Sequence, residues 1–120
     1  MKKDLTPNET EKKAIEIITQ GLVDLSILNG ELNELIEKGA YRDFYMHRVG
    51  HWMGMDVHDV GSYGLNGKWR KYLPGMITTI EPGIYFKENL KNVPEEYLNI
   101  GIRIEAVSYT HLTLPTSVPV

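Results

Sequence analysis

Hydrophobic residues near the start of the chain recur at steps of three and four, the period of an amphipathic helix. The stripe that we expect to be buried consists of Ala14, Ile17, Ile18, Leu22 and Leu25. Just before it, Thr6, Pro7 and Glu9 form a capping-box pattern, with the proline at the first helical position. The pattern therefore predicts a helix that begins at Pro7.

A second, shorter helix is predicted after the sequence SILNG interrupts this period. Leu32, Leu35 and Ile36 lie on one side of it, and Gly39 is a typical C-terminal stop. From Tyr41 onward the pattern changes to short runs rich in β-branched and aromatic residues, which predict strands at FYMH, MITTIE, GIYF and NIGIRIE. Two helices followed by several strands favour an α+β fold, with the helices on one face of an antiparallel sheet.

The last residues break this pattern. The sequence VSYTHLTLPTSVPV contains no charged residue, and Val107 to Thr116 can be read as one frame of a transposon-end adapter used to prepare sequencing libraries. We therefore expect residues 1–106 to form the native part of one domain and residues 107–120 to be a non-native tail. His111 is given no functional weight for this reason.

Composition narrows the setting. The formal net charge is −3 and the isoelectric point is about 5.8, so no basic surface favours nucleic acid as a partner. The chain has no cysteine, so any metal would be held by His, Asp and Glu, a set that suits manganese, iron, cobalt or zinc. No apolar run approaches the length of about 20 residues that spans a bilayer, and the start lacks the apolar core of a signal peptide. We expect a soluble, cytoplasmic protein without a membrane partner.

Three of the four histidines, His47, His51 and His58, fall close together, with Asp56 and Asp59 among them. In an extended strand, residues four apart point the same way, so His47 and His51 would share a face. The cluster is either a metal site with its proton-transfer groups or a polar loop rich in histidine. Spacing alone does not say which of the five groups would be ligands.

Two glutamates are further candidates. Glu81 ends the run MITTIE before a Pro-Gly turn, so it lies either exposed at the end of the sheet or directed into a site. In NIGIRIE the isoleucines Ile100, Ile102 and Ile104 line one face of a strand, which we expect to lie over a core. The other face, with Arg103 and Glu105, either meets solvent or lines a cleft.

Three motifs follow one another along the chain, and their order and spacing matter as much as their residues: HRVGHWMGMDVHDVG, LPGMITTIEPGIY and GIRIE. Together they resemble the pita-bread metallopeptidases, and within them the Xaa-Pro aminopeptidase (aminopeptidase P) group. The resemblance runs from about Thr6 to Glu105. It implies the second half of a pita-bread domain, in which helices pack on an antiparallel sheet.

The resemblance also implies roles for single residues. The family holds two divalent metals, usually manganese, between two aspartates, one histidine and two glutamates. The ligands carried over by motif are His51, Glu81 and Glu105. His47 and His58 match histidines that position the substrate, shuttle protons and stabilise the oxyanion. Glu81 would also take the proton of the attacking water and return it. Arg103 would orient the carboxylates of the site.

The implied reaction is release of an N-terminal residue from Xaa-Pro peptides by a metal-activated water. The resemblance allows a homo-oligomer for the intact parent. The family's two aspartate ligands would lie upstream of the first helix, and nothing before Thr6 supplies them. We therefore expect the 120-residue chain alone to be inactive. The alternatives are a prolidase- or creatinase-type relative, or a non-catalytic peptide-binding half domain.

Overall fold

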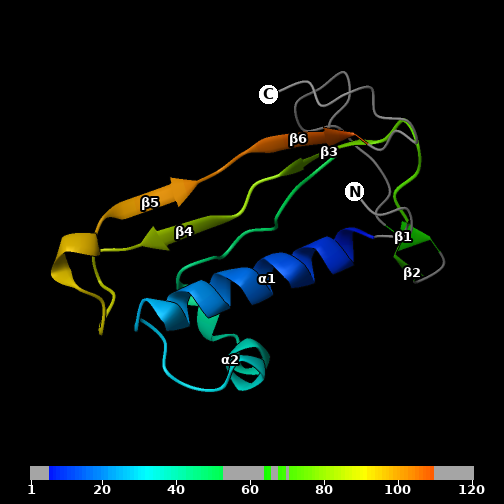
Figure 1. Cartoon of the computed structure of the whole chain (residues 1–120). Coiled ribbons are helices and arrows are strands. Elements are labelled where there is room, and N and C mark those ends of the chain that lie inside the picture. The colour runs from blue at the N-terminus through cyan, green and yellow to red at the C-terminus, as the bar shows by residue number, and fades with distance from the viewer. Residues whose placement is uncertain (1–5, 53–63, 66–67, 70, 110–120) are drawn as a thin grey trace.

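Two α-helices precede a set of antiparallel strands in the computed structural model, which confirms the α+β class (Figure 1). The structure describes residues 6–52, 64–65, 68–69 and 71–109. The helices are α1 (Pro7–Asp24) and α2 (Leu32–Lys38), with short 3₁₀ helices at Ala40–Asp43 and Glu95–Tyr97. The strands are β1 (Gly64–Leu65), β2 (Lys68–Trp69), β3 (Ile77–Ile80), β4 (Gly83–Phe86), β5 (Ile100–Arg103) and β6 (Ala106–Tyr109).

Both predicted helices are confirmed, and their ends have the expected caps. At the start of α1 the Thr6 hydroxyl accepts a hydrogen bond from the Glu9 amide at 3.3 Å, and the Glu9 carboxylate accepts one from the Thr6 amide at 2.9 Å. These two bonds satisfy backbone N–H groups that a helix start leaves without partners. At the end of α2, Gly39 has φ of 70°, a left-handed conformation that favours glycine.

Strands β3 to β6 form one long two-stranded ribbon with a single interruption, and β1 pairs with β2 separately. β3 pairs with β6 and β4 pairs with β5, and Ile80 lies opposite Ala106. Gly83 lies opposite Arg103 in the next ladder, so continuing the register between the ladders places Pro82 opposite Ile104. The Ile104 amide donates to the Pro82 carbonyl at 3.1 Å, but proline has no N–H to return the bond. Pro82 thus interrupts the ladder without shifting its register.

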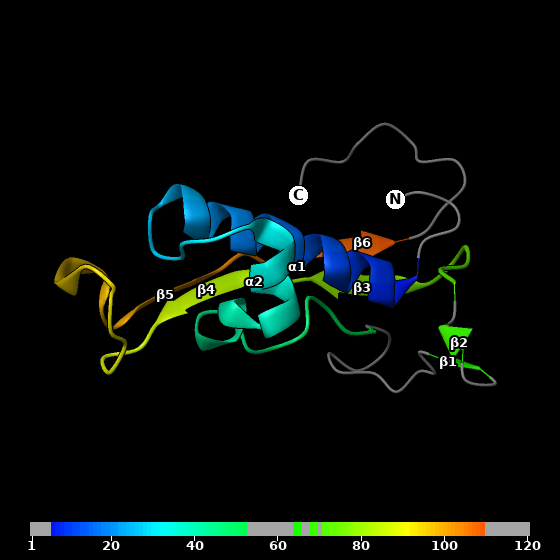
Figure 2. The same ribbon diagram turned by 90° about the horizontal axis from the view of Figure 1, so that it is seen from below.

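The core lies between α1 and β4, so the prediction of helices packed on an antiparallel sheet is confirmed (Figure 2). Its buried residues come from α1, from the loop after it and from the segment before β3; they are Ile18, Leu22, Ile27, Phe44 and Tyr45. Ile84 and Phe86 of β4 pack against them, and the Phe44 and Phe86 rings meet edge to face at 5.8 Å. This packing fixes the segment that follows the second helix against the sheet.

Some details of the sequence prediction are wrong. Ile17 and Leu25 were expected in the buried stripe of α1, but they are 61% and 54% exposed, because they flank the face that meets β4. The run FYMH was expected to be a strand, but residues 44–47 lie outside the strands. That segment is held by the Tyr85 amide, which donates to the Phe44 carbonyl at 2.8 Å, and by burial of its aromatic rings.

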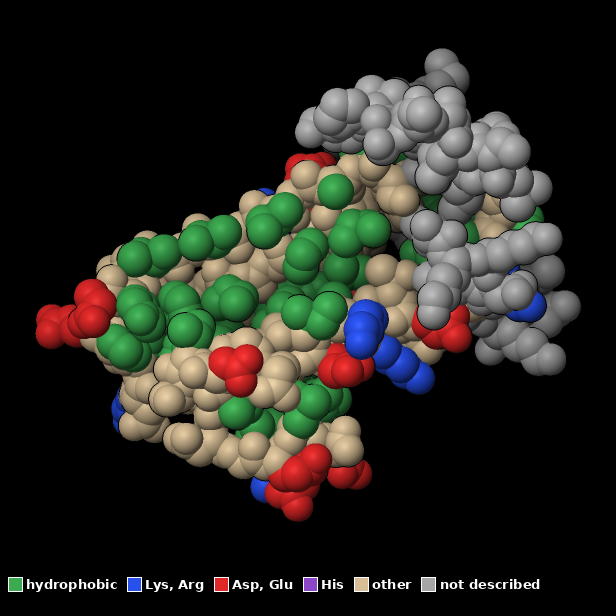
Figure 3. Space-filling model, in the orientation of Figure 1, with side chains coloured by type: hydrophobic (Ala, Val, Ile, Leu, Met, Phe, Trp, Pro, Cys, Tyr) green, Lys and Arg blue, Asp and Glu red, His purple; other side chains and the backbone are tan. Residues whose placement is uncertain are grey.

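The aliphatic face of β5 is exposed. Ile100, Ile102 and Ile104 are 45%, 64% and 66% exposed, so the expectation that they lie over a core is wrong for the described part of the chain. Together with Ile84 and Leu25 they line an apolar groove of about 310 Å³. Figure 3 shows hydrophobic side chains in rows along this part of the ribbon. An α-helix is about 10 Å wide and covers about two strands. Because α1 already lies over β4 and the segment beside it, the aliphatic face of β5 stays exposed in the described part of the chain.

Replacing Ile102 by lysine should reduce self-association. Exposed apolar patches promote association, and the substitution places a charge in the middle of this one without removing a buried side chain. We expect the monomer fraction in size-exclusion chromatography with light scattering to rise, and the fluorescence of an added hydrophobic dye to fall. Asn29→Lys adds the same charge in the exposed loop between α1 and α2. An equal gain in both variants would show that net charge, not the apolar face, controls association.

Candidate metal and proton-transfer site

The segment that carries His51 lies alongside β3 in an antiparallel arrangement. Trp52 forms an isolated bridge with Thr78, and the Thr79 amide donates to the His51 carbonyl at 3.0 Å. Further along, the Glu81 amide donates to the Val49 carbonyl. These bonds place His51, from the first motif, beside the strand end that carries Glu81, from the second.

Gly50 allows the two backbones to come this close. A Cβ atom at this position would lie 1.9 Å from the Thr79 carbonyl oxygen, a distance that no side chain tolerates. Gly50 therefore sets the separation between the histidine segment and β3, because any larger residue would push them apart.

His51 and Glu81 are brought together. The His51 Nε2 lies 3.0 Å from Glu81 Oε2, and both side chains are largely buried, with exposed fractions of 24% and 14%. The other ring nitrogen, Nδ1, lies 3.0 Å from the Trp52 carbonyl, which only accepts, so Nδ1 carries a proton. The fully buried Thr79 donates its hydroxyl to Glu81 Oε2 at 2.8 Å. The Trp52 carbonyl and the Thr79 hydroxyl therefore fix which nitrogen of His51 and which oxygen of Glu81 face each other.

This pair suits a divalent cation. A carboxylate facing the lone pair of a neutral imidazole is unfavourable unless a proton or a metal ion lies between them. An imidazole nitrogen and a carboxylate oxygen are donors that manganese, iron, cobalt or zinc accepts, so His51 Nε2 and Glu81 Oε2, 3.0 Å apart, would hold such an ion together. The hydrogen bond from Nδ1 to a backbone carbonyl also matches the arrangement usual for a metal-binding histidine.

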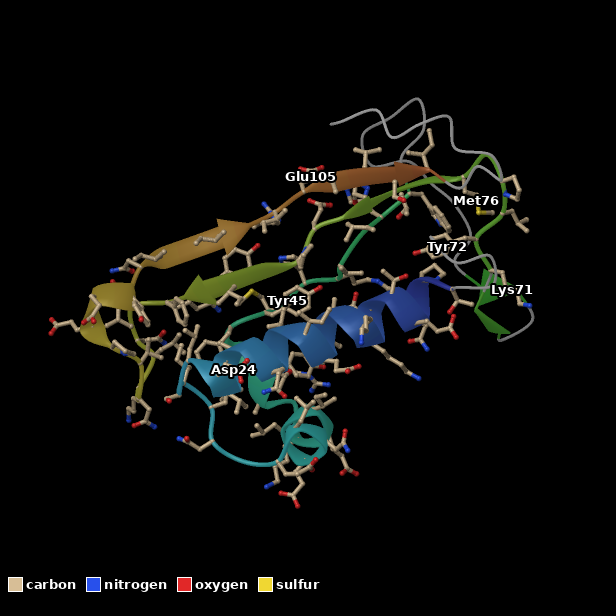
Figure 4. The ribbon with its side chains drawn as sticks, in the orientation of Figure 1. Asp24, Tyr45, Lys71, Tyr72, Met76 and Glu105 are labelled. Carbon is tan, nitrogen blue, oxygen red and sulfur yellow. The ribbon has the colours of Figure 1, made fainter. Side chains whose placement is uncertain are left out.

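Glu105 faces Glu81 across the ribbon. Because the register runs unbroken from the Ile80–Ala106 pair to the Gly83–Arg103 pair, Glu81 and Glu105 lie directly opposite each other. Glu105 is exposed and lies between β5 and β6 (Figure 4). Like charges directly opposite on paired strands are destabilising, and a bound cation would relieve the repulsion. Within the ranges that the structure describes, however, no three His, Cys, Asp or Glu side chains lie close enough to hold one ion.

His47 is held on the same face by Tyr85, a residue that the sequence analysis missed. The Tyr85 hydroxyl lies 2.7 Å from His47 Nε2, and His47 Nδ1 lies 2.7 Å from the Arg48 carbonyl. The carbonyl fixes the proton on Nδ1, so the tyrosine hydroxyl donates to Nε2. Tyr85 follows Glu81 by four positions along β3 and β4, so both point to one face of the ribbon. That spacing was the signal available in the sequence.

Of the remaining candidate residues, the structure describes only Arg103. Arg103 is exposed, opposite Gly83, and shares a face with Glu105 because the two are separated by two positions. His58, Asp56, Asp59 and His111 lie outside the described residues. The structure thus joins His51 to Glu81 and places His47 on the same face.

Tyr45 lies beneath this site, between α1 and β4 (Figure 4). Its ring meets His47 edge to face at 4.9 Å, and its side chain is almost fully buried. Burial raises the pKa of Tyr45 well above its usual value, and the nearby Glu11 carboxylate raises that pKa further. The hydroxyl of Tyr45 therefore stays protonated beside His47 throughout the neutral range.

This combination of fold and motifs defines a metallopeptidase. The chain belongs to metallopeptidase family M24, whose model matches residues 7–110. Its curated relatives include the Xaa-Pro aminopeptidase of Haemophilus influenzae, which is 51% identical over 123 residues. The Xaa-Pro aminopeptidase of Escherichia coli is 48% identical over 97 residues. These alignments cover 96% and 81% of this chain but only 28% and 22% of the relatives, so the chain spans about a quarter of their length.

Solved structures agree with the family. The aminopeptidase PepP of Pseudomonas aeruginosa matches with a TM-score of 0.83 and 48% identity, covering 87% of this chain and 24% of that one. The proline aminopeptidase P II of Yersinia pestis matches with a TM-score of 0.85 and 42% identity, covering 94% and 26%. The predicted pita-bread fold is therefore confirmed. Among the described residues, no helix has the length and hydrophobicity needed to cross a bilayer.

Replacing Gly50 by alanine should separate the His51 segment from β3. The added methyl group would meet the Thr79 carbonyl, so we expect the free energy of unfolding in urea to fall by about 2–3 kcal/mol. Gly21→Ala is the control, because nothing lies within 4 Å of its Cβ position in α1 and alanine favours a helix. A Gly50→Ala chain as stable as Gly21→Ala would contradict this close approach.

Tyr45 should make the chain less stable in alkali. The folded state raises its pKa, so its contribution is fully present below the unfolded pKa of about 10 and is lost as the pH rises above it. The free energy of unfolding in urea should therefore begin to fall near pH 10 and continue to fall as the pH rises, and Tyr45→Phe should flatten that fall. An unchanged slope in Tyr45→Phe would show that Tyr45 is not the group responsible.

Proposed function

We propose that this chain supplies part of the active site of a metal-dependent aminopeptidase that releases the N-terminal residue from Xaa-Pro peptides. The observation that carries the proposal is the His51–Glu81 pair, 3.0 Å apart, with the proton of the imidazole fixed on the far nitrogen. The names of the relatives in family M24 support the reaction and the substrate class.

In this proposal His51, Glu81 and Glu105 are ligands of a dinuclear site, and manganese is the metal. The donor set of imidazole and carboxylate without thiolate suits manganese, as it suits iron, cobalt and zinc. Bound divalent ions lower the pKa of water and polarise a carbonyl group. Binding of cations would also remove the repulsion between Glu81 and Glu105, which the strand register places face to face.

The side chains of this site are proposed to have separate tasks in the reaction. Glu81 accepts the proton of the attacking water and returns it to the leaving nitrogen, while the Thr79 hydroxyl keeps the carboxylate oriented. His47 and His58 are proposed to position the substrate, shuttle protons and stabilise the oxyanion that forms at the scissile carbonyl. For His47 to donate there, its Nε2 would have to be protonated and exchange the Tyr85 hydroxyl for the substrate. Arg103 is proposed to orient the carboxylates of the site.

Proline explains why such an enzyme is needed. A peptide bond that precedes proline has no N–H, and the φ of the proline is fixed near −65°, so the bond does not fit the backbone recognition that other peptidases use. A site that polarises the carbonyl directly does not depend on that N–H. We propose a cytoplasmic location, and a homo-oligomer for the intact parent protein.

The 120-residue chain alone is proposed to bind metal weakly and to be inactive, because it carries three of the five expected ligands. In calorimetric titrations with Mn²⁺, Glu81→Gln and His51→Ala should each weaken binding by at least about tenfold. Glu95→Gln, an exposed position in the second 3₁₀ helix, is the control. An Xaa-Pro peptide with Mn²⁺ should not be hydrolysed by the chain.

Two results would contradict this proposal in different ways. Equal Mn²⁺ affinity in Glu81→Gln and Glu95→Gln would remove the ligand assignment. Turnover of the Xaa-Pro peptide by the purified chain would overturn the predicted inactivity and leave the ligand assignment standing.

A further inference from the structure

Glu11 of α1 reaches across to the segment between the two histidines. Its Oε2 accepts a hydrogen bond from the Val49 amide at 2.6 Å. Val49 lies midway between His47 and His51 in the sequence, and its side chain is only 5% exposed. A carboxylate that accepts from a backbone N–H forms a charge-assisted bond, which is roughly twice as strong as a neutral one.

The other side of Val49 is bound to the sheet. Its carbonyl accepts a hydrogen bond from the Glu81 amide, the residue that faces His51. One peptide segment is therefore tied to α1 through its N–H and to the end of β3 through its carbonyl. Because His47 and His51 each stand two residues from Val49, the bond from Glu11 limits how far both imidazoles can shift.

The position of Glu11 is not explained by helix formation. The start of α1 is already capped by Thr6 and Glu9. Glu16, one and a half turns further along α1, lies exposed and contacts Lys13 at 3.4 Å. Glu11 instead lies half-buried beside Tyr45, whose pKa it raises, in a cavity that His47 also lines.

We propose that Glu11 is a positioning residue for the metal-binding and proton-transfer histidines, holding His51 and His47 in place through the Val49 amide. This inference deepens the proposed function and rests on it. In this proposal Glu11 is not itself a ligand and acts through its bond to the Val49 amide.

The test compares three variants of the chain. Glu11→Ala removes the acceptor, Glu11→Gln keeps an acceptor oxygen without the charge, and Glu16→Ala removes an exposed glutamate from the same helix. Alanine favours a helix, so a defect in Glu11→Ala cannot come from weakening α1 itself. Circular dichroism and thermal melting confirm that each variant is folded.

Two measurements are made on each variant. One is the affinity for Co²⁺ from its visible absorption, and the other is the ¹⁵N shifts of the His47 and His51 rings, which report the Nδ1-protonated form. We expect Glu11→Ala to bind Co²⁺ about three- to tenfold more weakly and to give averaged ring shifts. Glu11→Gln should restore most of both, and Glu16→Ala should match the unmodified chain.

The outcomes separate this inference from the proposed function. If the unmodified chain binds no Co²⁺, the ligand assignment fails, and the ring shifts alone then decide the role of Glu11. If Glu11→Ala matches Glu16→Ala in its ring shifts, the inference is overturned whatever the metal affinity. A loss in Glu11→Gln as large as in Glu11→Ala would also overturn it, because the acceptor oxygen is still present.

Discussion

The close approach of the segment before Trp52 to β3 is the constraint on which the site depends. At Gly50 the two backbones are too near for any side chain, and the bonds on either side align the segment with the strand. That alignment sets His51 against Glu81 and presents the Val49 amide to Glu11. The absence of a Cβ atom at Gly50 thus sets the distance between His51 and Glu81. The Glu11 carboxylate of α1 limits how far the segment can still move.

The two faces of the ribbon carry different side chains: the residues of the candidate site lie on one face and aliphatic residues on the other. In paired antiparallel strands, residues directly opposite share a face, so Glu81, Tyr85, Arg103 and Glu105 fall on one side. The same alternation puts the isoleucines of β5 on the other side, where the described part of the chain leaves them exposed. Pro82 interrupts the hydrogen bonding between the two ladders but keeps the register, so the alternation passes through the interruption unchanged.

Local patterns predicted the helices well because the signals are local. The capping box at Thr6 and Glu9 and the glycine stop at Gly39 both depend on residues within one turn, and the structure has both. Strand predictions succeeded for β3, β4 and β5, whereas β1, β2 and β6 were not predicted, and the prediction failed at FYMH. That run has strand-forming residues, but burial of Phe44 and Tyr45 in the core decides its shape.

The sequence by itself determined the class of fold, the family and the residue types available for chemistry. Hydrophobic periodicity and helix caps depend on residues only a few positions apart. The order and spacing of the motifs can likewise be read from the sequence without coordinates. Only the tertiary structure decided that His51 meets Glu81, that Tyr85 holds His47 and that Glu11 reaches Val49. Those contacts join positions about 30 to 40 apart, and their geometry depends on strand register and on one glycine, which no local pattern encodes.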